Sequence, residues 1–283
     1  MAKSKIEWLE GGKVWNPVTG CTRVSPGCDN CYAIRQSHRF SGVKGSKFEG
    51  VTLRQAQGER VDWTGVVRCH EDLLEMPLSW RKPERVFVNS MADLFHDDVP
   101  EEFIFKVWKT MLESPRHTYM ILTKRPQRMK VVVKKIETWL ADTYPSRRTI
   151  AGVPLPNVWL GVSCEDQRWR IKRIPHLLNT PAAVRFVSLE PMLGGIDLWQ
   201  YLGGNRNPIG EAYGGKGLDL VICGGESGPG ARPMELEWAR SVRDQCVAAG
   251  VPFFFKQWGG CGKKRAGRLL DGREWNEFPE TSK

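Results

Sequence analysis

The segment Arg85-Val-Phe-Val-Asn-Ser-Met-Ala-Asp93 decides the fold class, because a short strand-forming run ends directly in a polar cluster. Five later runs repeat this arrangement: Thr118-Tyr-Met-Ile-Leu122, Val158-Trp-Leu-Gly-Val162, Val184-Arg-Phe-Val187, Leu218-Asp-Leu-Val-Ile222 and Val251-Pro-Phe-Phe-Phe255. Continuous apolar runs indicate strands that are buried on both faces, as in parallel sheets. Helix-like segments at 99–112 and 235–249 fall between them. The sequence therefore predicts an α/β fold, a partial or near-complete parallel TIM-type (βα) barrel.

The domain organisation is predicted from the chain length and from the alternation of strand-forming and helix-forming segments. A chain of 283 residues suits one large α/β domain or two small ones. Two Gly-rich stretches, near 41–64 and 203–217, interrupt the strand and helix pattern and are typical of loops or a lid. We expect one domain over 1–283 with insertions at these two stretches.

Composition narrows the class of protein. With 26% charged residues, the chain has no apolar run of membrane-spanning length, and its N-terminus lacks a signal-peptide pattern. We expect a cytoplasmic protein without membrane contact, in which eight cysteines serve metal or redox chemistry more readily than four disulfides. The formal charge of +10 and twelve tryptophans suit a nucleic-acid partner.

Polar clusters follow all six strands. In parallel α/β folds, ligands bind at the carboxyl ends of strands. These ends carry Asn89-Ser-Met-Ala-Asp93, Thr123-Lys-Arg-Pro126, Ser163-Cys-Glu-Asp166, Ser188-Leu-Glu-Pro191, Gly224-Gly-Glu-Ser-Gly228 and Lys256-Gln-Trp-Gly259. Loops are polar in any protein, but six clusters in register predict one shared pocket.

Cys21, Cys28 and Cys31 lie in one short loop, with six residues between the first pair and two between the second. A structural zinc ion would need a fourth ligand, for which Cys69, His70 and His38 are candidates. An iron–sulfur cubane held by three thiolates would leave one iron open for a small molecule. Thiolates suit either metal, so the spacing alone leaves both open.

The context of this loop favours the cluster. It follows an expected first strand near 13–18 and precedes a helix-like stretch at 32–40, the arrangement of radical S-adenosylmethionine (SAM) enzymes. Their usual spacing is three residues and then two, with an aromatic residue before the last cysteine. Here the first gap is six, and the aromatic Tyr32 follows the last cysteine, so the match is to a variant.

Nearly the whole chain resembles the phage and prophage three-cysteine-motif proteins related to radical SAM enzymes. The segments that carry the resemblance are Ile6-Glu-Trp, Trp15-Asn-Pro-Val-Thr-Gly-Cys21, Cys28-Asp-Asn-Cys31-Tyr-Ala, Val86 to His96, Leu122-Thr-Lys-Arg-Pro126, Asn157 to Ser163, Gly224 to Pro233 and Phe253 to Gly259. The resemblance implies a barrel of the radical SAM kind, a [4Fe-4S] cluster on Cys21, Cys28 and Cys31, and SAM. For some phage members it implies thymine hypermodification of DNA.

Roles for the strand-end residues follow from this expectation. Ser90 and Asp93 take the place of the usual Gly-Gly-Glu segment at the methionyl amine of SAM, whereas Gly224, Gly225 and Glu226 serve the adenine or the substrate. Ser163 and Glu165 are placed for the ribose, although an N-cap serine with a first-turn acid fits equally. Glu190 and Lys256 are candidates for proton transfer or substrate binding.

The remaining assignments concern the partner and the other thiols. Lys124 and Arg125 predict a phosphate clamp, with surface solvation as the alternative, and Lys263, Lys264 and Arg265 predict a DNA backbone contact. Cys164, Cys223 and Cys246 are expected in the core. Cys69, His70 and Cys261 could complete a zinc site.

Three functions remain open. The first is a phage or prophage enzyme that rearranges an amino-acid-substituted thymine, with flavodoxin or ferredoxin as electron donor. The second is a radical SAM DNA-repair lyase. The third is a zinc-stapled nucleic-acid-binding protein without catalysis.

Overall fold

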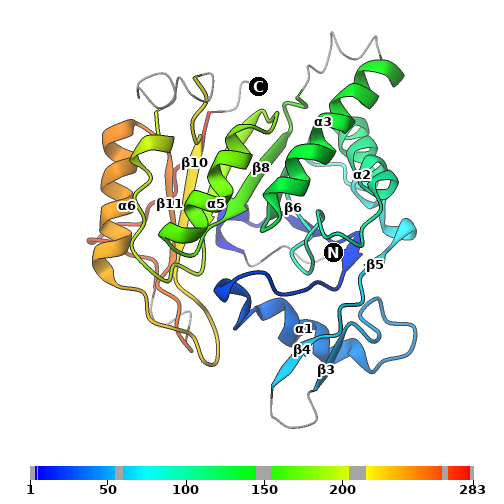
Figure 1. Ribbon diagram of the computed structural model, residues 1–283, viewed down its shortest axis with the longest axis horizontal. Helices are drawn as coiled ribbons and strands as arrows, with labels where there is room; N and C mark the ends of the chain where they lie inside the picture. Colours follow the sequence, from blue (N-terminus) through cyan, green and yellow to red (C-terminus); the bar gives the residue numbers. More distant parts are fainter. Residues whose placement is uncertain are drawn as a thin grey trace. The chain divides into compact units, whose positions relative to one another are not determined.

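The computed structural model describes residues 4, 6–54, 60–144, 154–203, 215–262 and 267–280 (Figure 1). Its strands are β1 (Lys13–Trp15), β2 (Val18–Thr19), β3 (Thr52–Arg54), β4 (Val61–Trp63), β5 (Arg68–Cys69), β6 (Arg85–Val88), β7 (Thr118–Thr123), β8 (Val158–Ser163), β9 (Val184–Leu189), β10 (Leu220–Gly224) and β11 (Phe253–Gln257). Its α-helices are α1 (Tyr32–Ser41), α2 (Glu101–Glu113), α3 (Pro126–Thr143), α5 (Gln167–Leu178) and α6 (Leu236–Ala249). Short 3-10 helices are η1 (Glu7–Leu9), η2 (Pro26–Cys28), η3 (Glu71–Leu73), η4 (Met76–Ser79) and η5 (Trp199–Tyr201).

The main sheet has seven strands in the order β1-β6-β7-β8-β9-β10-β11. The pairs β1–β6, β6–β7, β9–β10 and β10–β11 are parallel. The predicted α/β class with a parallel sheet is confirmed. The strand order never reverses along the sheet, which is the order of TIM-type barrels and differs from that of doubly wound sheets.

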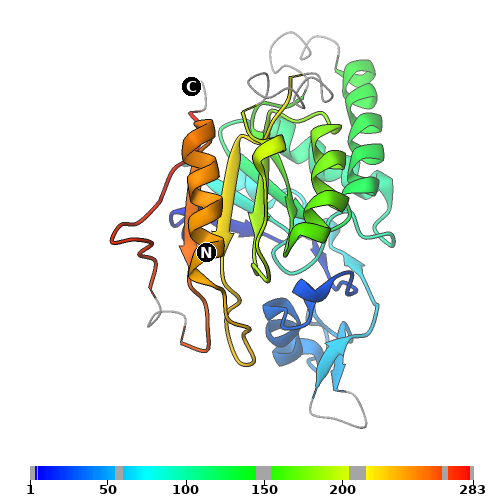
Figure 2. The ribbon, with the colours of Figure 1, turned by 60° about the vertical axis from the view of Figure 1, so that its left-hand side comes forward.

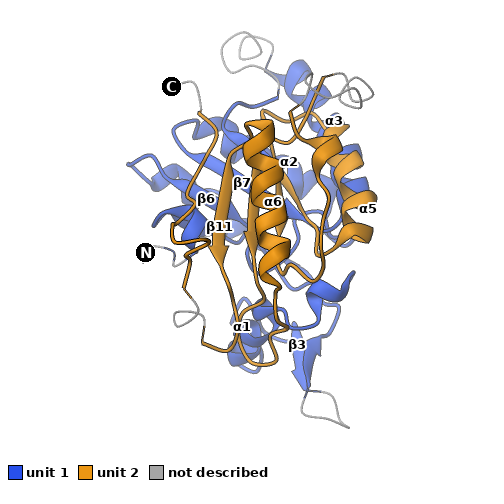
Figure 3. Cartoon of the chain, turned by 90° about the vertical axis from the view of Figure 1, so that its left-hand side faces the viewer, with its two compact units in different colours: residues 1–159 blue, residues 160–283 orange. Residues whose placement is uncertain are grey.

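The chain forms two compact units, Met1–Trp159 and Leu160–Lys283 (Figure 3). The boundary falls inside β8. The first unit contains β1, β6, β7 and α1 to α3, together with the two-stranded sheets β2–β5 and β3–β4. The second contains β9 to β11, α5 and α6. The expectation of one domain over 1–283 stays a prediction.

Burial confirms why the strand runs are continuously apolar. Every residue of β8, β9 and β10 is buried, so neither face of these strands meets water. Close packing requires glycine at position 161, where a Cβ would lie 2.5 Å from the ring of Phe186. Among the described residues, no helix combines the length and apolar character that crossing a membrane needs.

Helix ends position the strand-end loops. Glu101 and Glu102 occupy the first turn of α2 after the N-cap Pro100, as the sequence predicts. Gly250 ends α6 in the left-handed region at φ 66°, which confirms the expected cap. Helix α6 packs on β10 and β11 (Figure 2).

Two expected strand boundaries shift for a physical reason. β11 begins at Phe253 and not at Val251, because the Val251 amide donates to the Cys246 carbonyl as part of the α6 cap (2.9 Å). β10 begins at Leu220, because the carboxylate of Asp219 accepts a hydrogen bond from the Arg185 amide (2.7 Å). The same two strands also end later than expected, at Gly224 and Gln257, so Gly224 and Lys256 lie inside their strands and not after them.

The N-terminal segment also differs from its expected form. The single strand near 13–18 is two strands, because β1 pairs with β6 whereas β2 pairs with β5. Part of the expected loop at 41–64 is the β3–β4 hairpin, whose three-residue strands are too short to produce a visible period. Residues 55–59, and 204–214 of the second expected insertion, lie outside the described residues.

Candidate functional site

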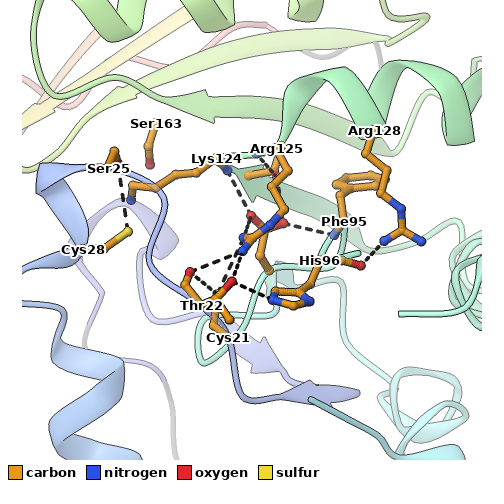
Figure 4. Close-up of polar contacts among 12 residues, drawn as sticks. Cys21, Thr22, Ser25, Cys28, Phe95, His96, Lys124, Arg125, Arg128 and Ser163 are labelled. Atoms are coloured by element: carbon orange, nitrogen blue, oxygen red, sulfur yellow. Dashed lines mark hydrogen bonds and ion pairs between the residues drawn. The ribbon is translucent and has the colours of Figure 1, made fainter. Parts of the chain in front are cut away.

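The three cysteines lie in the loop that joins β2 to α1, as predicted. Figure 4 shows two of them, Cys21 and Cys28. Cys28 ends the 3-10 helix η2, and its amide donates to the Ser25 carbonyl (2.9 Å). Cys31 is the N-cap residue of α1. All three cysteines are free, so none is consumed by a disulfide, and each is half-buried as a whole residue.

Electrostatics shows that the three thiols are neighbours. Burial and the Asp93 carboxylate raise the pKa of Cys21 to about 12; Cys31 and Cys28 also raise it, while Arg125 lowers it. Burial also raises the pKa of Cys31, whereas Lys124 and the amides of Ala33 and Ile34 lower it. Burial therefore favours the protonated form of Cys21 and Cys31, and a metal that binds such thiols releases their protons.

Arg125 directs its guanidinium into this loop. Nη1 donates to the Asp93 carboxylate (3.0 Å) and to Cys21 Sγ (3.7 Å), and Nη2 donates to the hydroxyl (2.7 Å) and carbonyl (3.3 Å) of Thr22. Its side chain is 10% exposed. Four of its five donors are used inside the protein. In the structure Arg125 thus contacts the cysteine loop, and the predicted phosphate clamp at Arg125 stays a prediction.

Asp93 holds Arg125 and the strand ends together. Its Oδ1 accepts from the Thr123 hydroxyl (2.7 Å) and the Phe95 amide (3.0 Å), and its Oδ2 accepts from the Lys124 amide (3.1 Å) and Arg125. The residue is 5% exposed. The predicted role at the methionyl amine of SAM would require this filled carboxylate to exchange a partner, so its observed task is to position Arg125.

Thr22 links the loop to His96, a residue that sequence reasoning left as a modest candidate. The Asp98 amide donates to His96 Nδ1 (3.2 Å), so Nε2 carries the proton and donates to Thr22 Oγ1 (2.9 Å). Burial and the charge of Arg125 lower the pKa of His96, which keeps the imidazole neutral. Arg128 donates to the carbonyls of His96 and Val99 and fixes this turn.

Ser90 lies in the same edge of the first unit but has a structural partner. Its hydroxyl donates to Asn16 Oδ1 (3.2 Å), and its carbonyl accepts from the Tyr32 hydroxyl (2.6 Å). Tyr32 is the aromatic residue after the last cysteine. It therefore ties α1, and with it Cys31, to the end of β6.

The donor set suits a metal cluster, although the thiols are not drawn together as ligands. Within the described residues, no group of three or more His, Cys, Asp or Glu side chains is placed to hold a metal ion. Rotation about each Cα–Cβ bond moves a sulfur without moving the loop. Arg125 lowers the pKa of Cys21 and Lys124 lowers the pKa of Cys31, so these two cations oppose the larger effect of burial and favour the thiolate form of a metal ligand.

In the second unit, Glu190, Lys256 and Gln257 meet at the ends of β9 and β11. Lys256 Nζ lies 2.5 Å from Glu190 Oε1, and the Gln257 amide donates to the same oxygen (3.4 Å) and to the Gly225 carbonyl (3.3 Å). Gln257 Oε1 is buried without a hydrogen-bond donor. Glu190 and Lys256, which the sequence named as separate candidates, form one ion pair, and Gln257 is a member of this cluster that sequence reasoning did not single out.

Gly225 and Glu226 have structural roles after β10. A Cβ on Gly225 would lie 2.0 Å from the Trp258 carbonyl, so glycine is needed there for the approach of two loops. Glu226 binds Arg232 through both carboxylate oxygens (2.6 and 2.9 Å) and also accepts from the Arg232 amide (2.9 Å). The assignment of these residues to adenine or substrate stays a prediction.

Ser163 ends β8 and Glu165 follows it, and both residues contact Arg173. The Arg173 guanidinium donates to the Ser163 carbonyl (2.7 Å) and to Glu165 Oε2 (3.0 Å), and Glu165 is fully buried. The alternative of Ser163 as an N-cap is wrong, because Asp166 caps α5 by accepting from the Trp169 amide (3.1 Å). An ion pair buried this deeply holds the β8–α5 turn in place.

The remaining predicted residues are the other cysteines, the basic residues and the four predicted pocket residues. Cys164, Cys223 and Cys246 are buried, as expected, whereas Cys261 is exposed. Lys124 stays a candidate for phosphate binding. Lys263, Lys264 and Arg265 lie outside the described residues. The prediction that Asp93, Ser163, Glu190 and Glu226 line one pocket joins both units and stays a prediction.

These features define a class: an α/β protein with parallel strands and a three-thiol loop at a strand-end edge. Residues 3–279 match the family model DUF5131, described as a protein of unknown function. The chain belongs to this DUF5131 family. A comparison with curated proteins and one with solved structures each found no match.

Proposed function

We propose that this protein is a radical SAM enzyme whose parallel sheet is part of a partial TIM-type barrel and which modifies a base in DNA. The observation that carries the proposal is the group of three free thiols on one loop, with Arg125 directed at Cys21. In this proposal Cys21, Cys28 and Cys31 hold a [4Fe-4S] cluster, which with bound SAM supplies the 5′-deoxyadenosyl radical.

The chain's own residues would order and protect this site. Arg125 donates to Cys21 and so offsets the negative charge of thiolate ligands, while Asp93 fixes the direction of the guanidinium. Tyr32 anchors the loop to β6 through the Ser90 carbonyl. Glu190 and Lys256 form an ion pair at the strand ends of the second unit (2.5 Å), which places a proton donor and a proton acceptor side by side for a substrate.

The test is cluster content in matched cysteine variants. After anaerobic reconstitution, we expect four irons and four sulfides per chain in the wild type. Cys21→Ala, Cys28→Ala and Cys31→Ala should each lose the cluster and reductive SAM cleavage. Cys69→Ala and Cys261→Ala, which remove thiols outside the loop, should keep both. Zinc in place of iron, or a cluster retained in Cys28→Ala, would overturn the proposal in favour of a zinc-stapled protein or another ligand set.

The reaction is tested on DNA. Nucleosides from host or phage DNA, made with and without this gene, should differ by a modified thymine when analysed by mass spectrometry. Conversion of a thymine dimer lesion to thymines by the purified protein would instead identify a repair lyase. Turnover of a free nucleoside or peptide alone would remove DNA as the substrate.

A further inference from the structure

The end of α1 and the loop that follows it, in the lower part of Figure 1, carry a group of cationic and aromatic residues. We call it the Phe40 patch; it consists of Arg39, Phe40, Val43, Lys44, Lys47 and Phe48. Residues 39–48 contain these three cations and no Asp or Glu. Neither the proposed cluster site nor the strand-end clusters use any of them.

The patch exposes an aromatic ring in a fixed orientation. Phe40 is 51% exposed and Val43 52% exposed, although both are large apolar residues. The ring of Phe40 stacks on Phe48 with centroids 6.2 Å apart and planes 30° apart, and Lys47 Nζ lies 5.3 Å from the Phe48 centroid. One face of the Phe40 ring is thus supported, and the ring remains open to a planar partner.

The cations of the patch are not neutralised by the protein. Within the described residues, Arg39, Lys44 and Lys47 form no ion pair with a carboxylate. The nearest acid in sequence, Glu49, turns back to accept the Gly45 amide (2.7 Å). Three uncompensated charges around an exposed aromatic ring complement a polyanion that also offers planar groups.

The backbone under the patch is already ordered. Ser41 Oγ donates to the Thr52 carbonyl (2.7 Å) and accepts from the Thr52 amide (3.1 Å), which fixes α1 on the β3–β4 hairpin. The Gly50 amide closes the loop by donating to the Ser41 carbonyl (2.9 Å). A partner would therefore meet a preformed surface, and little loop entropy is lost on binding.

We propose that the Phe40 patch binds an unpaired segment of DNA, with phosphates on Arg39, Lys44 and Lys47 and a base stacked on Phe40. The choice of DNA rests on the proposed function. Stacking requires a base whose face is free, which duplex DNA does not offer, whereas the cations supply a backbone contact that ignores sequence. An acidic protein would use the charges but would not need the ring. An anionic lipid surface would use both, so acidic vesicles form one arm of the experiment.

The experiment measures binding of a fluorescent single-stranded oligonucleotide to the full chain at several salt concentrations. Arg39→Gln/Lys44→Gln/Lys47→Gln should weaken binding and lower the slope of log affinity against log salt by about 2, since each single-strand phosphate contact contributes about 0.7. The matched control is Arg81→Gln/Lys82→Gln/Lys134→Gln, which removes three exposed cations elsewhere in the first unit. It should leave the slope close to that of the wild type.

The aromatic contact is tested with Phe40→Ala, which should weaken single-strand binding about 5- to 100-fold and duplex binding much less. Phe40→Trp should restore it, which shows that a lost ring and not misfolding is responsible. Three results would contradict the proposal that the Phe40 patch binds unpaired DNA. The two triple variants could show equal salt slopes, Phe40→Ala could weaken duplex and single-strand binding equally, or the protein could bind acidic vesicles more tightly than DNA.

The outcomes separate this surface from the proposed function. Cluster content and SAM cleavage should be unchanged in all these variants, because none touches the cysteine loop. If the wild type binds DNA but the patch variants behave as the control does, only the proposal that the Phe40 patch binds DNA is contradicted. If the wild type binds no DNA while it holds a cluster, the surface and the DNA substrate both fail, and the cluster assignment stands.

Discussion

Arg125 is the residue whose observed contacts most change the expected chemistry of the site. Its Nη1 group donates to both Cys21 and Asp93, and a single ammonium could not reproduce the fork to Thr22. A hydrogen bond to a ligand sulfur stabilises the reduced, more negative cluster. Arg125 therefore acts as a positioning and tuning residue for the proposed cluster.

Arg125→Lys should keep the iron content but lower the midpoint potential of the cluster by about 50 mV, the equivalent of roughly 1 kcal/mol for one electron. Potentiometry followed by electron paramagnetic resonance measures this. Arg128→Lys is the matched control, because Arg128 lies on the same helix but donates to the carbonyls of His96 and Val99. Equal shifts in the two variants would contradict a specific contact to Cys21.

At the scale of elements, the start of the cysteine loop depends on Gly20. Its φ of +86° is left-handed, and a Cβ would lie 2.0 Å from the Val66 carbonyl. Gly20→Ala should therefore lower the free energy of unfolding by about 3 kcal/mol, as backbone strain and a backbone clash combine.

Gly42→Ala is the control for Gly20→Ala. Gly42 follows α1 at φ −89°, and a Cβ there would meet nothing within 4 Å. Its effect should stay within about 1 kcal/mol and favour folding, because alanine restricts the unfolded chain. Urea unfolding of both variants measures the difference in the free energy of unfolding. Comparable losses in the two variants would contradict the predicted clash of a Cβ at position 20 with the Val66 carbonyl.

The N-terminus of α5 gives a second prediction at this scale. Asp166→Ala should cost about 1 kcal/mol of unfolding free energy, because the Trp169 amide loses its acceptor. Ser163→Ala should cost much less, since Arg173 binds the Ser163 carbonyl and not its hydroxyl. Thermal unfolding of the two variants distinguishes them, and a larger loss in Ser163→Ala would restore Ser163 as the cap.

At the scale of the whole molecule, buried imidazoles couple stability to pH. Burial lowers the pKa of His70, His96 and His117, so the folded state binds fewer protons than the unfolded state near pH 6. The stability they contribute is complete above the unfolded pKa of 6.5 and is lost as pH falls through their lower folded values.

His117 allows a single-site check of this dependence. Its Nδ1 accepts the Glu84 amide (3.2 Å) and its Nε2 lies 3.1 Å from the Pro77 carbonyl, so the neutral ring satisfies both contacts. His117→Gln should flatten the pH dependence of the unfolding free energy below pH 6.5, by at most about 1.4 kcal/mol per pH unit. Urea unfolding at pH 5 to 8 measures the slope. An unchanged slope would mean that His117 does not titrate differently on folding.

The sequence by itself determined the strand and helix alternation, the parallel class of the sheet and the three-thiol loop before α1. These depend on local patterns: continuous apolar runs, Gly250 after a helix and three cysteines within eleven residues. The proximity of Lys256 and Glu190 could also have been predicted, because the sequence placed both at the ends of strands, and those strands both neighbour β10.

Only the tertiary structure decided which partners the polar side chains at the strand ends contact. Arg125 and Cys21 are 104 residues apart in sequence, and they meet because β1, β6 and β7 run parallel and in register. A cluster such as Lys124-Arg125 has the same composition whether it faces solvent or a carboxylate. Here the buried Asp93 carboxylate pairs with the Arg125 guanidinium, because a carboxylate removed from water needs a partner.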